Sequence, residues 1–199
     1  MNNDFVRQGY NKIADNYLDK RDVFKNRKYL DKLIELLPTG STILDIGCGA
    51  GTPIDSYLVS KGFKIVGIDI SERQIELAKK HVPKGNYERK DMSEISEKEY
   101  KVDAVISFYA IFHIPRETHP ELFRKIRSFI PKNGYTLVTM GHSDWVGTEN
   151  DFFGGEMAWS HFDAKKNKDI IKEAGFDIVF DEIDISGDEK HLIVLAKKT

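Results

Sequence analysis

Three glycines at alternate positions constrain this chain more than any other feature. Gly47, Gly49 and Gly51 follow directly after the apolar run Thr42–Ile46, which has the composition of a strand buried on both faces. Glycines at the end of a strand permit a tight turn and let the backbone approach a ligand closely. A helix predicted behind them would present free N–H groups to an anionic group. The pattern predicts a strand–turn–helix unit with a ligand site at the turn; a plain glycine-rich turn is the alternative.

Helical and strand-like segments alternate along the rest of the chain. Helical spacing of apolar residues, with capping boxes at Ser71–Gln74 and Thr118–Glu121, predicts helices, and short apolar runs predict strands. This alternation indicates a parallel α/β sheet, and a closing hairpin implies that the last strand enters it antiparallel. The predicted helices are 4–20, 24–37, 52–61, 71–81, 118–130 and 163–174, and the predicted strands are 42–46, 64–69, 86–91, 102–108, 135–140, 176–185 and 191–197.

Length and composition limit the class of protein. The 199 residues suit one domain, or one domain with an insertion. The 30 basic and 32 acidic residues give a net charge of -2, which argues against a nucleic-acid binder held by a large basic field. The single cysteine, Cys48, cannot form an internal disulfide and fits a reducing compartment. Neither a signal peptide nor a membrane helix is visible. We therefore expect a cytoplasmic protein.

Two acidic residues sharpen the prediction of a ligand site. Asp69 ends the second predicted strand, where a carboxylate can accept hydrogen bonds from ribose hydroxyls. Asp91 ends the third, where a carboxylate can accept from an exocyclic amine, and the thioether of Met92 can pack on a purine. Each acid alone would more often be a cap or a turn residue. Together with the glycines, at three successive strand ends, they predict a nucleoside site.

The spacing of the glycines favours one kind of nucleoside. The dinucleotide fingerprint is Gly-x-Gly-x-x-Gly, but here the third glycine, Gly51, comes one position early and Thr52 stands in its place. Asp45, two residues before the first glycine, would repel a pyrophosphate and suits an α-ammonium group. A ligand with an adenosine end and an amino-acid end therefore fits better than a dinucleotide.

These motifs resemble a known family. Asp45-x-Gly47-x-Gly49-x-Gly51, followed by Gly67–Ser71 and Lys90–Met92, is similar to the class I S-adenosylmethionine-dependent methyltransferases of the small-molecule type. The resemblance covers nearly the whole chain. It implies a Rossmann-like, doubly wound α/β sheet of seven strands in the order 3-2-1-4-5-7-6, with strand 7 antiparallel.

The resemblance also implies the cofactor-binding residues. Gly47, Gly49 and Asp45 would hold the methionine end of S-adenosylmethionine, Asp69 the ribose, and Asp91 with Met92 the adenine. Residues 1–37 would form N-terminal cap helices in which Tyr17 closes over the cofactor, although Tyr17 suits a core position equally well. Cys48 suits a packing role in the loop. The predicted cofactor set is completed by Cys48, Ile70 and Phe108.

The methyl acceptor is predicted less directly. The Asn/Asp-Pro-Pro-aromatic signature of amino-directed nucleic-acid methyltransferases is absent after the fourth predicted strand, where Ser107–Ala110 stands. Residues 142–162 break the alternation and are rich in aromatic residues, which predicts a substrate lid; a small satellite core is the alternative. His142 or His161 could act as general base, although each also suits a capped or solvated side chain. Tyr109, Phe112 and His113 lie beyond a strand end where ligands bind; a core position for Phe112 and a surface position for His113 are the alternatives. No spacing is a recognised metal signature.

We therefore predict a single methyltransferase domain over 1–199 that uses S-adenosylmethionine and methylates a small molecule. It is expected to be a monomer or homodimer, with no metal, nucleic-acid or membrane partner. The alternatives are a nicotinamide-dependent oxidoreductase and a non-catalytic nucleoside-binding interaction module.

Overall fold

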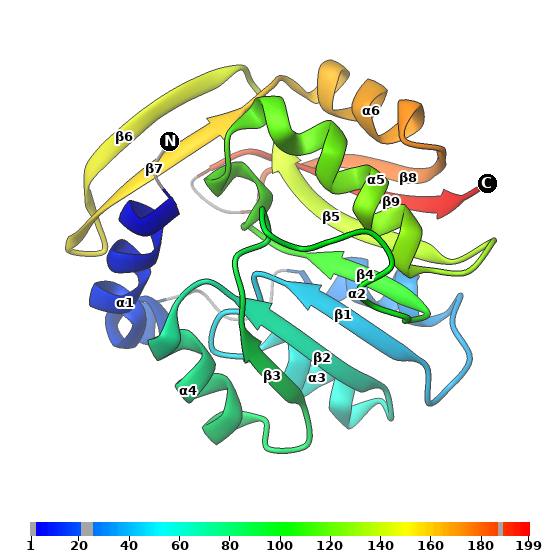
Figure 1. The fold of residues 1–199 in the computed structure, drawn as a ribbon, viewed down its shortest axis with the longest axis horizontal. Coiled ribbons are helices and arrows are strands. Elements are labelled where there is room, and N and C mark those ends of the chain that lie inside the picture. The colour runs from blue at the N-terminus through cyan, green and yellow to red at the C-terminus, as the bar shows by residue number, and fades with distance from the viewer. Residues whose placement is uncertain (1–2, 21–25, 187–188) are drawn as a thin grey trace.

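A seven-stranded sheet forms the centre of the molecule (Figure 1). The computed structural model describes the backbone of residues 3–20, 26–186 and 189–199, and the side chains of all these except 17–20. The strand order is β3-β2-β1-β4-β5-β9-β8, and β9 runs antiparallel to β5 and to β8. Counted within the sheet, this is the predicted order 3-2-1-4-5-7-6 with an antiparallel seventh strand, so the predicted fold class is confirmed.

The strands of the sheet are short and apolar, as the sequence predicts. Their bounds are β1 Thr42–Ile46, β2 Lys64–Asp69, β3 Asn86–Arg89, β4 Ala104–Ser107, β5 Tyr135–Gly141, β8 Phe176–Asp184 and β9 His191–Lys198. The helices are α1 Asn3–Lys20, α2 Arg27–Ile34, α3 Ile54–Ser60, α4 Glu72–His81, α5 His119–Phe129 and α6 Ala164–Glu173, with short 3-10 turns η1 Ile111–His113 and η2 Arg116–Thr118.

Helices cover both faces of the sheet. Leu30 of α2, Leu58 of α3 and Ala78 of α4 pack with strand residues in one core cluster. Phe123 of α5 and Ile170 of α6 pack with the strands in the other. Strands β2, β1, β4 and β5 are parallel neighbours, so their carboxyl ends meet at one edge of the sheet. That edge is where ligands bind in open α/β sheets.

The two predicted capping boxes differ in outcome. The Ser71 hydroxyl accepts the backbone N–H of Gln74 at 3.1 Å and caps α4, as predicted. The prediction at Thr118 is wrong, because its side chain makes no capping bond to α5 and its hydroxyl donates to the Pro115 carbonyl at 2.6 Å. The 3-10 turn η2 precedes α5 directly and occupies that hydroxyl.

The predicted loop at 142–162 is in fact a hairpin. Strands β6 Trp145–Phe152 and β7 Gly155–His161 pair antiparallel and form a second, separate sheet. These strands are hard to predict because β6 is exposed along most of its length and its register shifts between Glu149 and Phe152, which removes the alternation of a half-buried strand.

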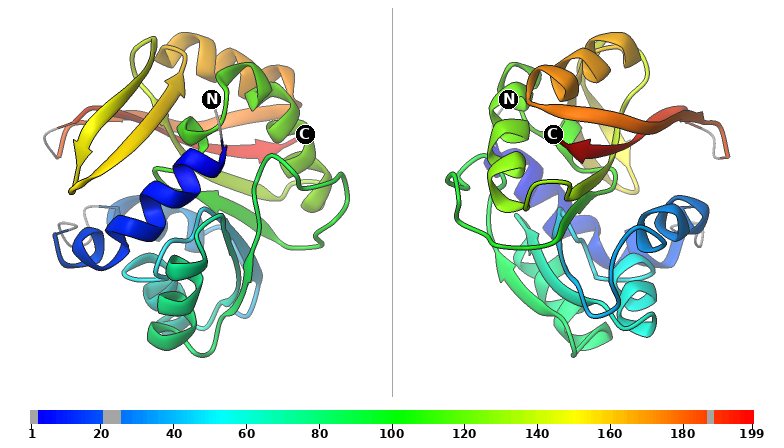
Figure 2. Two further views of the ribbon diagram at one scale, coloured as in Figure 1. Left: turned by 60° about the vertical axis from the view of Figure 1, so that its left-hand side comes forward. Right: turned by 90° about the vertical axis from the view of Figure 1, so that its right-hand side faces the viewer.

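Helix α1 links this hairpin to the main sheet. Figure 2 shows it lying across the molecule between the β6–β7 hairpin and α4. Its approach to β7 is close, because a Cβ on Gly9 would lie 2.6 Å from the Glu156 carbonyl oxygen, and one on Gly155 would lie 2.5 Å from Ile13 Cγ2. Two glycines therefore let the helix and the strand meet.

Candidate functional site

A pocket lies at the carboxyl ends of β1, β2, β3 and β4, beneath α1. Residues from six segments line it, so it exists only in the folded chain. Eight residues of the predicted site take part: Gly47, Gly49, Asp69, Ile70, Asp91, Met92, Phe108 and Tyr109. The sequence did not lead us to include the others, which are Asn3, Val6, Tyr10, Gln74, Lys90, Ala110, His113 and Ile114.

The glycine loop turns sharply at the end of β1. Gly47, Gly49 and Gly51 all have positive φ, at 79°, 54° and 72°, a conformation that other residues adopt only with strain. A Cβ on Gly47 would lie 2.2 Å from the Cβ of Ala110, so no side chain fits there. The N–H groups of Gly47 and Cys48 donate to the Ile68 carbonyl at 2.8 and 3.0 Å, which holds the loop against β2.

Asp69 connects the glycine loop to α4. One carboxylate oxygen accepts the Gly49 N–H and the other accepts the Ser71 N–H, both at 2.9 Å. Burial raises its pKa from 3.8 to about 6 in spite of these bonds. Each carboxylate oxygen has two acceptor sites, so both can take a further donor from a ligand in the pocket. Asp69 therefore positions the loop and keeps capacity for hydroxyl groups.

Asp91 is held by neighbours on two segments. One oxygen accepts the N–H and the hydroxyl of Ser93, each at 2.8 Å, and the other accepts the side-chain amide of Asn3 at 2.8 Å. Asn3 belongs to α1, so the first turn of this helix closes the adenine end of the predicted site. No sequence motif signals Asn3, because its partners lie 88 and 90 residues away.

Asp45 and Cys48 lie behind the loop and are not among the residues that line the pocket. Asp45 is 2% exposed and hydrogen-bonds to Asp55 of α3, which also accepts the Tyr87 hydroxyl at 3.0 Å. Burial raises the pKa of Asp55, so the two carboxyl groups can share a proton. Burial, and next the Asp69 charge, raises the pKa of the Cys48 thiol well above its ordinary value. Asp45 and Cys48 are therefore placed to stabilise the glycine loop.

Tyr109 combines a strained backbone with a fixed side chain. Its φ is 57°, a left-handed conformation rare for a residue with a side chain, and its hydroxyl donates to the Asn26 side chain at 3.0 Å. Residues in such conformations cluster at functional sites. The turn directs the chain from β4 into η1, and His113 of η1 and Ile114 after it line the pocket.

The two histidines predicted as general bases stay a prediction, because no finding tests their role. Neither His142 nor His161 is among the residues that line the pocket, and no residue of 142–162 is. His161 Nδ1 donates to the Ser143 carbonyl at 2.6 Å. The aromatic residues of this segment pack on one another and on α1, with ring centroids of Phe152 and Trp159 5.1 Å apart. This is the satellite core that the sequence left open; a lid role stays a prediction.

A tyrosine–histidine pair lines the pocket. The Tyr10 hydroxyl lies 2.8 Å from His113 Nε2, and His113 Nδ1 lies 2.7 Å from the Ala158 carbonyl oxygen of β7. Both side chains line the pocket. His113 follows a strand end, which is a weak signal that sequence alone leaves open. Tyr10 gives no signal, because its spacing is that of a core residue of a helix. The predicted cap residue Tyr17 has its side chain outside the described residues.

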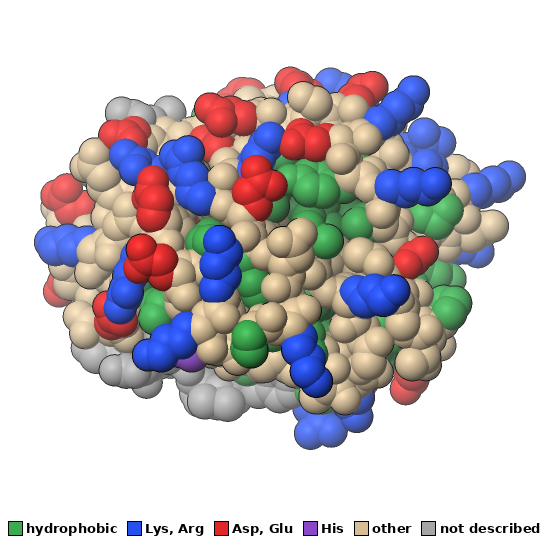
Figure 3. Space-filling model, turned by 60° about the horizontal axis from the view of Figure 1, so that its bottom comes forward, with side chains coloured by type: hydrophobic (Ala, Val, Ile, Leu, Met, Phe, Trp, Pro, Cys, Tyr) green, Lys and Arg blue, Asp and Glu red, His purple; other side chains and the backbone are tan. Residues whose placement is uncertain are grey.

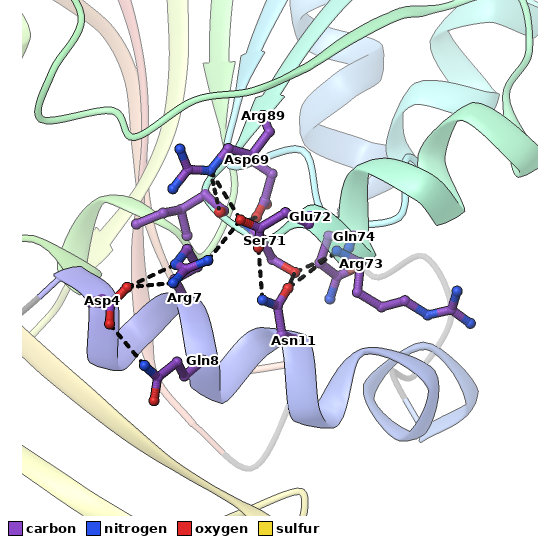
Figure 4. A network of polar contacts seen from close by, with 11 residues as sticks. Asp4, Arg7, Gln8, Asn11, Asp69, Ser71, Glu72, Arg73, Gln74 and Arg89 are labelled. Atoms are coloured by element: carbon purple, nitrogen blue, oxygen red, sulfur yellow. Dashed lines mark hydrogen bonds and ion pairs between the residues drawn. The ribbon is translucent and has the colours of Figure 1, made fainter.

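Polar contacts hold α1 over the pocket (Figure 4). Asn11 accepts the Ser71 hydroxyl at 2.6 Å and donates to Glu72 at 2.8 Å. Arg7 also donates to Glu72, at 2.7 Å. The pKa of Glu72 is lowered to about 2, mainly by the hydrogen bond from Asn11. Its own backbone N–H and the Arg7 guanidinium lower this pKa further. The start of α4 is thus tied to the middle of α1.

We predict that Asn11→Ala loosens α1 without unfolding the sheet. The variant loses its bonds to Ser71 and Glu72, and a net loss of about 1–2 kcal/mol should raise the opening equilibrium of the helix by a factor of about 5 to 30. Hydrogen exchange of residues 3–16 would measure it. The matched control is Asp15→Ala, which removes only the exposed ion pair with Arg73 and should change exchange little. Equal hydrogen exchange in both variants would contradict the role of Asn11 in holding α1 against α4.

Comparisons with known proteins agree with this geometry. Residues 43–134 match the sequence model of a family described as "Methyltransferase domain". The chain is 31% identical over 97 residues to 27-O-demethylrifamycin SV methyltransferase of Amycolatopsis mediterranei (45% of this chain, 36% of the relative). It is 29% identical over 137 residues to tRNA (carboxymethyluridine(34)-5-O)-methyltransferase of Saccharomyces cerevisiae (68% of this chain, 47% of the relative).

A solved structure shows the same fold. Magnesium protoporphyrin IX methyltransferase of Synechocystis, crystallised with S-adenosylhomocysteine, superposes with a TM-score of 0.77 at 17% identity and covers 100% of both chains. The sheet order and the glycine loop agree with the matched family model, which covers somewhat less than half of the chain, and the chain is similar to the class I S-adenosylmethionine-dependent methyltransferases. It spans about a third to a half of the length of these two curated relatives.

Proposed function

We propose that this protein transfers a methyl group from S-adenosylmethionine to a small-molecule acceptor. The observation that carries the proposal is the pocket itself, in which the turn of Gly47 and Gly49, the carboxylate of Asp69 and the carboxylate of Asp91 meet at one sheet edge. The cofactor supplies a methyl group on a positively charged sulfur, and the chain supplies binding and orientation. A nicotinamide-dependent activity is not favoured.

The residues present fit the cofactor. The absence of a Cβ at Gly47 lets a ligand lie against the loop, and Asp69 retains acceptor capacity for two ribose hydroxyls. Ile70, Met92 and Phe108 supply apolar surface for a purine ring. On this proposal Gly47 and Gly49 hold the methionine end, and Asp45 acts from behind the loop through its position rather than by contact.

The charge of the protein supports a small-molecule acceptor, and its single cysteine supports a reducing compartment. The net charge of -2 and the mixture of acidic and basic side chains over the face in Figure 3 offer no broad basic field for nucleic acid. One of the curated relatives is nevertheless named for a tRNA, so RNA belongs in any substrate screen. In the described part of the chain no helix has the length and hydropathy that crossing a membrane needs. We propose a cytoplasmic monomer or homodimer, organised as one domain.

Calorimetry with S-adenosylmethionine, S-adenosylhomocysteine and NADH tests the proposal. We expect one binding site with micromolar affinity for the first two ligands and no binding of NADH. Release of S-adenosylhomocysteine during incubation with small-molecule acceptors would then distinguish an enzyme from a non-catalytic nucleoside-binding module. Absence of binding at millimolar S-adenosylmethionine would refute the proposal.

A further inference from the structure

Two buried carboxyl groups meet behind the glycine loop. Asp45 lies near the end of β1, and Asp55 lies in the first turn of α3, where it has no exposed surface. The two side chains hydrogen-bond to each other, and the Tyr87 hydroxyl of β3 donates to Asp55 at 3.0 Å. An ionised carboxylate can only accept, so a bond between two carboxyl groups needs a proton on one of them. The pair holds one proton for as long as this bond exists.

The surroundings of the pair make its second ionisation unfavourable. Burial raises the pKa of Asp55 from 3.8 to about 7, although the bonds from its two partners oppose this effect. The neighbouring titratable groups are the Asp69 carboxylate of β2 and the Cys48 thiol, and burial raises the pKa of both. His81 of α4 reaches the same loop, with Nδ1 3.4 Å from the Ala50 carbonyl oxygen. In the described part of the chain no lysine or arginine forms an ion pair with Asp55. Two ionised carboxylates would repel each other here.

Asp55 is connected to the glycine loop through the backbone and through Tyr87. Helix α3 follows the loop directly, and the Ser56 N–H donates to the Gly51 carbonyl at 3.0 Å. The Tyr87 hydroxyl oxygen would lie 3.1 Å from a Cβ on Gly51, and the Tyr87 ring would lie 2.5 Å from a Cβ on Gly67. These contacts leave no space between the loop, α3 and Tyr87. A shift of α3 away from β1 therefore moves the glycine loop.

We propose that Asp55 is a positioning residue for the cofactor, because the proton that it shares with Asp45 holds α3 against β1 and thereby fixes the glycine loop. The inference rests on the proposed methyltransferase function. With the proton present, the loop keeps the positive φ angles with which Gly47 and Gly49 line the pocket. When the proton leaves, the two carboxylates repel, α3 moves and the loop loses this shape. Cofactor affinity therefore falls as the pH rises above about 7.

Stability of the cofactor-free protein gives the first test. Folding raises the pKa of Asp55, so the contribution of this residue to stability is complete below about pH 4 and is lost as the pH rises through about 7. Asp55→Asn keeps an N–H donor for Asp45 and an oxygen acceptor for Tyr87 at every pH. We expect the free energy of unfolding of wild type to fall relative to this variant over that range. Urea unfolding at a series of pH values measures it.

Calorimetric titration of S-adenosylhomocysteine between about pH 7 and about pH 8.5 gives the second test. The affinity of wild type should fall about tenfold more than that of Asp55→Asn. The ammonium group of the ligand titrates equally in both titrations, so the difference reports on Asp55. Tyr87→Phe removes a bond that favours the ionised Asp55, so the fall should begin at higher pH. His81→Gln is the matched control: it removes the titratable group at Ala50 and should behave as wild type.

Three outcomes would overturn the proposal. The pH profile of cofactor affinity is the same in wild type and Asp55→Asn, the fall begins at the same pH in wild type and Tyr87→Phe, or the fall disappears in His81→Gln. The Tyr87→Phe comparison does not depend on the folding of Asp55→Asn. If S-adenosylhomocysteine binds at no pH, the proposed function fails, whereas normal binding with an unaltered pH profile in Asp55→Asn refutes only the role of Asp55.

Discussion

Replacement of Gly47 with alanine is expected to lower the affinity for S-adenosylmethionine at least 100-fold and to destabilise the fold. The residue has a φ of 79°, which costs an L-residue about 1–2 kcal/mol. The added Cβ would also lie 2.2 Å from the Cβ of Ala110, so either the loop or the turn after β4 must move. Both segments line the pocket, so either movement changes its shape. Calorimetric titration and thermal unfolding measure the two effects.

Gly40→Ala separates backbone strain from the steric clash with Ala110. Gly40 has a similar φ of 86°, but a Cβ there would meet no atom within 4 Å, and Gly40 lies in the turn before β1, away from the pocket. This control should show the backbone strain alone and normal cofactor affinity. Normal cofactor affinity in Gly47→Ala would show that the glycine loop is not the binding surface.

Asp69→Ala is expected to reduce cofactor affinity by a factor of about 100 or more. The substitution removes the acceptor proposed for ribose and leaves the N–H groups of Gly49 and Ser71 without their partner. Loss of a charged acceptor of this kind costs about 1.5–3 kcal/mol, and disorder of the glycine loop adds to it. The control is Asp103→Ala, since Asp103 also accepts a backbone N–H, from Thr42, but stands outside the pocket lining. Equal losses in the two variants would contradict the role of Asp69.

The pH dependence of stability and of cofactor affinity provides a second test of the role of Asp69. Its pKa is raised to about 6, so the protonated form is favoured by folding. Asp69 therefore stabilises the free protein below pH 4, and this contribution is lost as the pH rises through about 6. Cofactor affinity should change in the opposite direction, because the ionised carboxylate is the better acceptor for ribose. Asp55 also has a raised pKa, so its titration contributes to the pH dependence of stability. The difference in pH dependence between wild type and Asp69→Asn gives the contribution of Asp69 alone. A cofactor affinity that does not change between pH 5 and pH 7 would contradict the role of the ionised Asp69 carboxylate.

The sheet could be predicted from the sequence because its signals are local. Each strand is a short apolar run bounded by turn residues, and the spacing of Gly47, Gly49 and Gly51 defines the turn after β1 without reference to distant residues. Asp69 and Asp91 were predictable for the same reason, since they follow strands whose carboxyl ends must share one edge. The structure brings both into the pocket.

The contact between Tyr10 and His113 could not be predicted, because its signals are not local. His142 and His161 are prominent in the sequence, but His142 follows β5, His161 ends β7, and neither lines the pocket. Tyr10 has the spacing of a core residue, and nothing in its neighbourhood indicates a partner 103 residues away. Asp45 was expected at the ligand, yet its side chain points toward α3, because successive side chains of a strand alternate between the two faces of the sheet.

The sequence distance between α1 and its partners also sets an order of events during synthesis. Chains grow at roughly 5–20 residues per second, so His113 follows Tyr10 by roughly 5–20 s. The β7 surface that Gly9 contacts is made later still. During this interval Val6 and Ile13, both buried in the finished protein, have no surface to cover them. Helix α1 is thus made well before the surfaces that it packs against, and the nascent chain must keep the apolar face of this helix from aggregation until then.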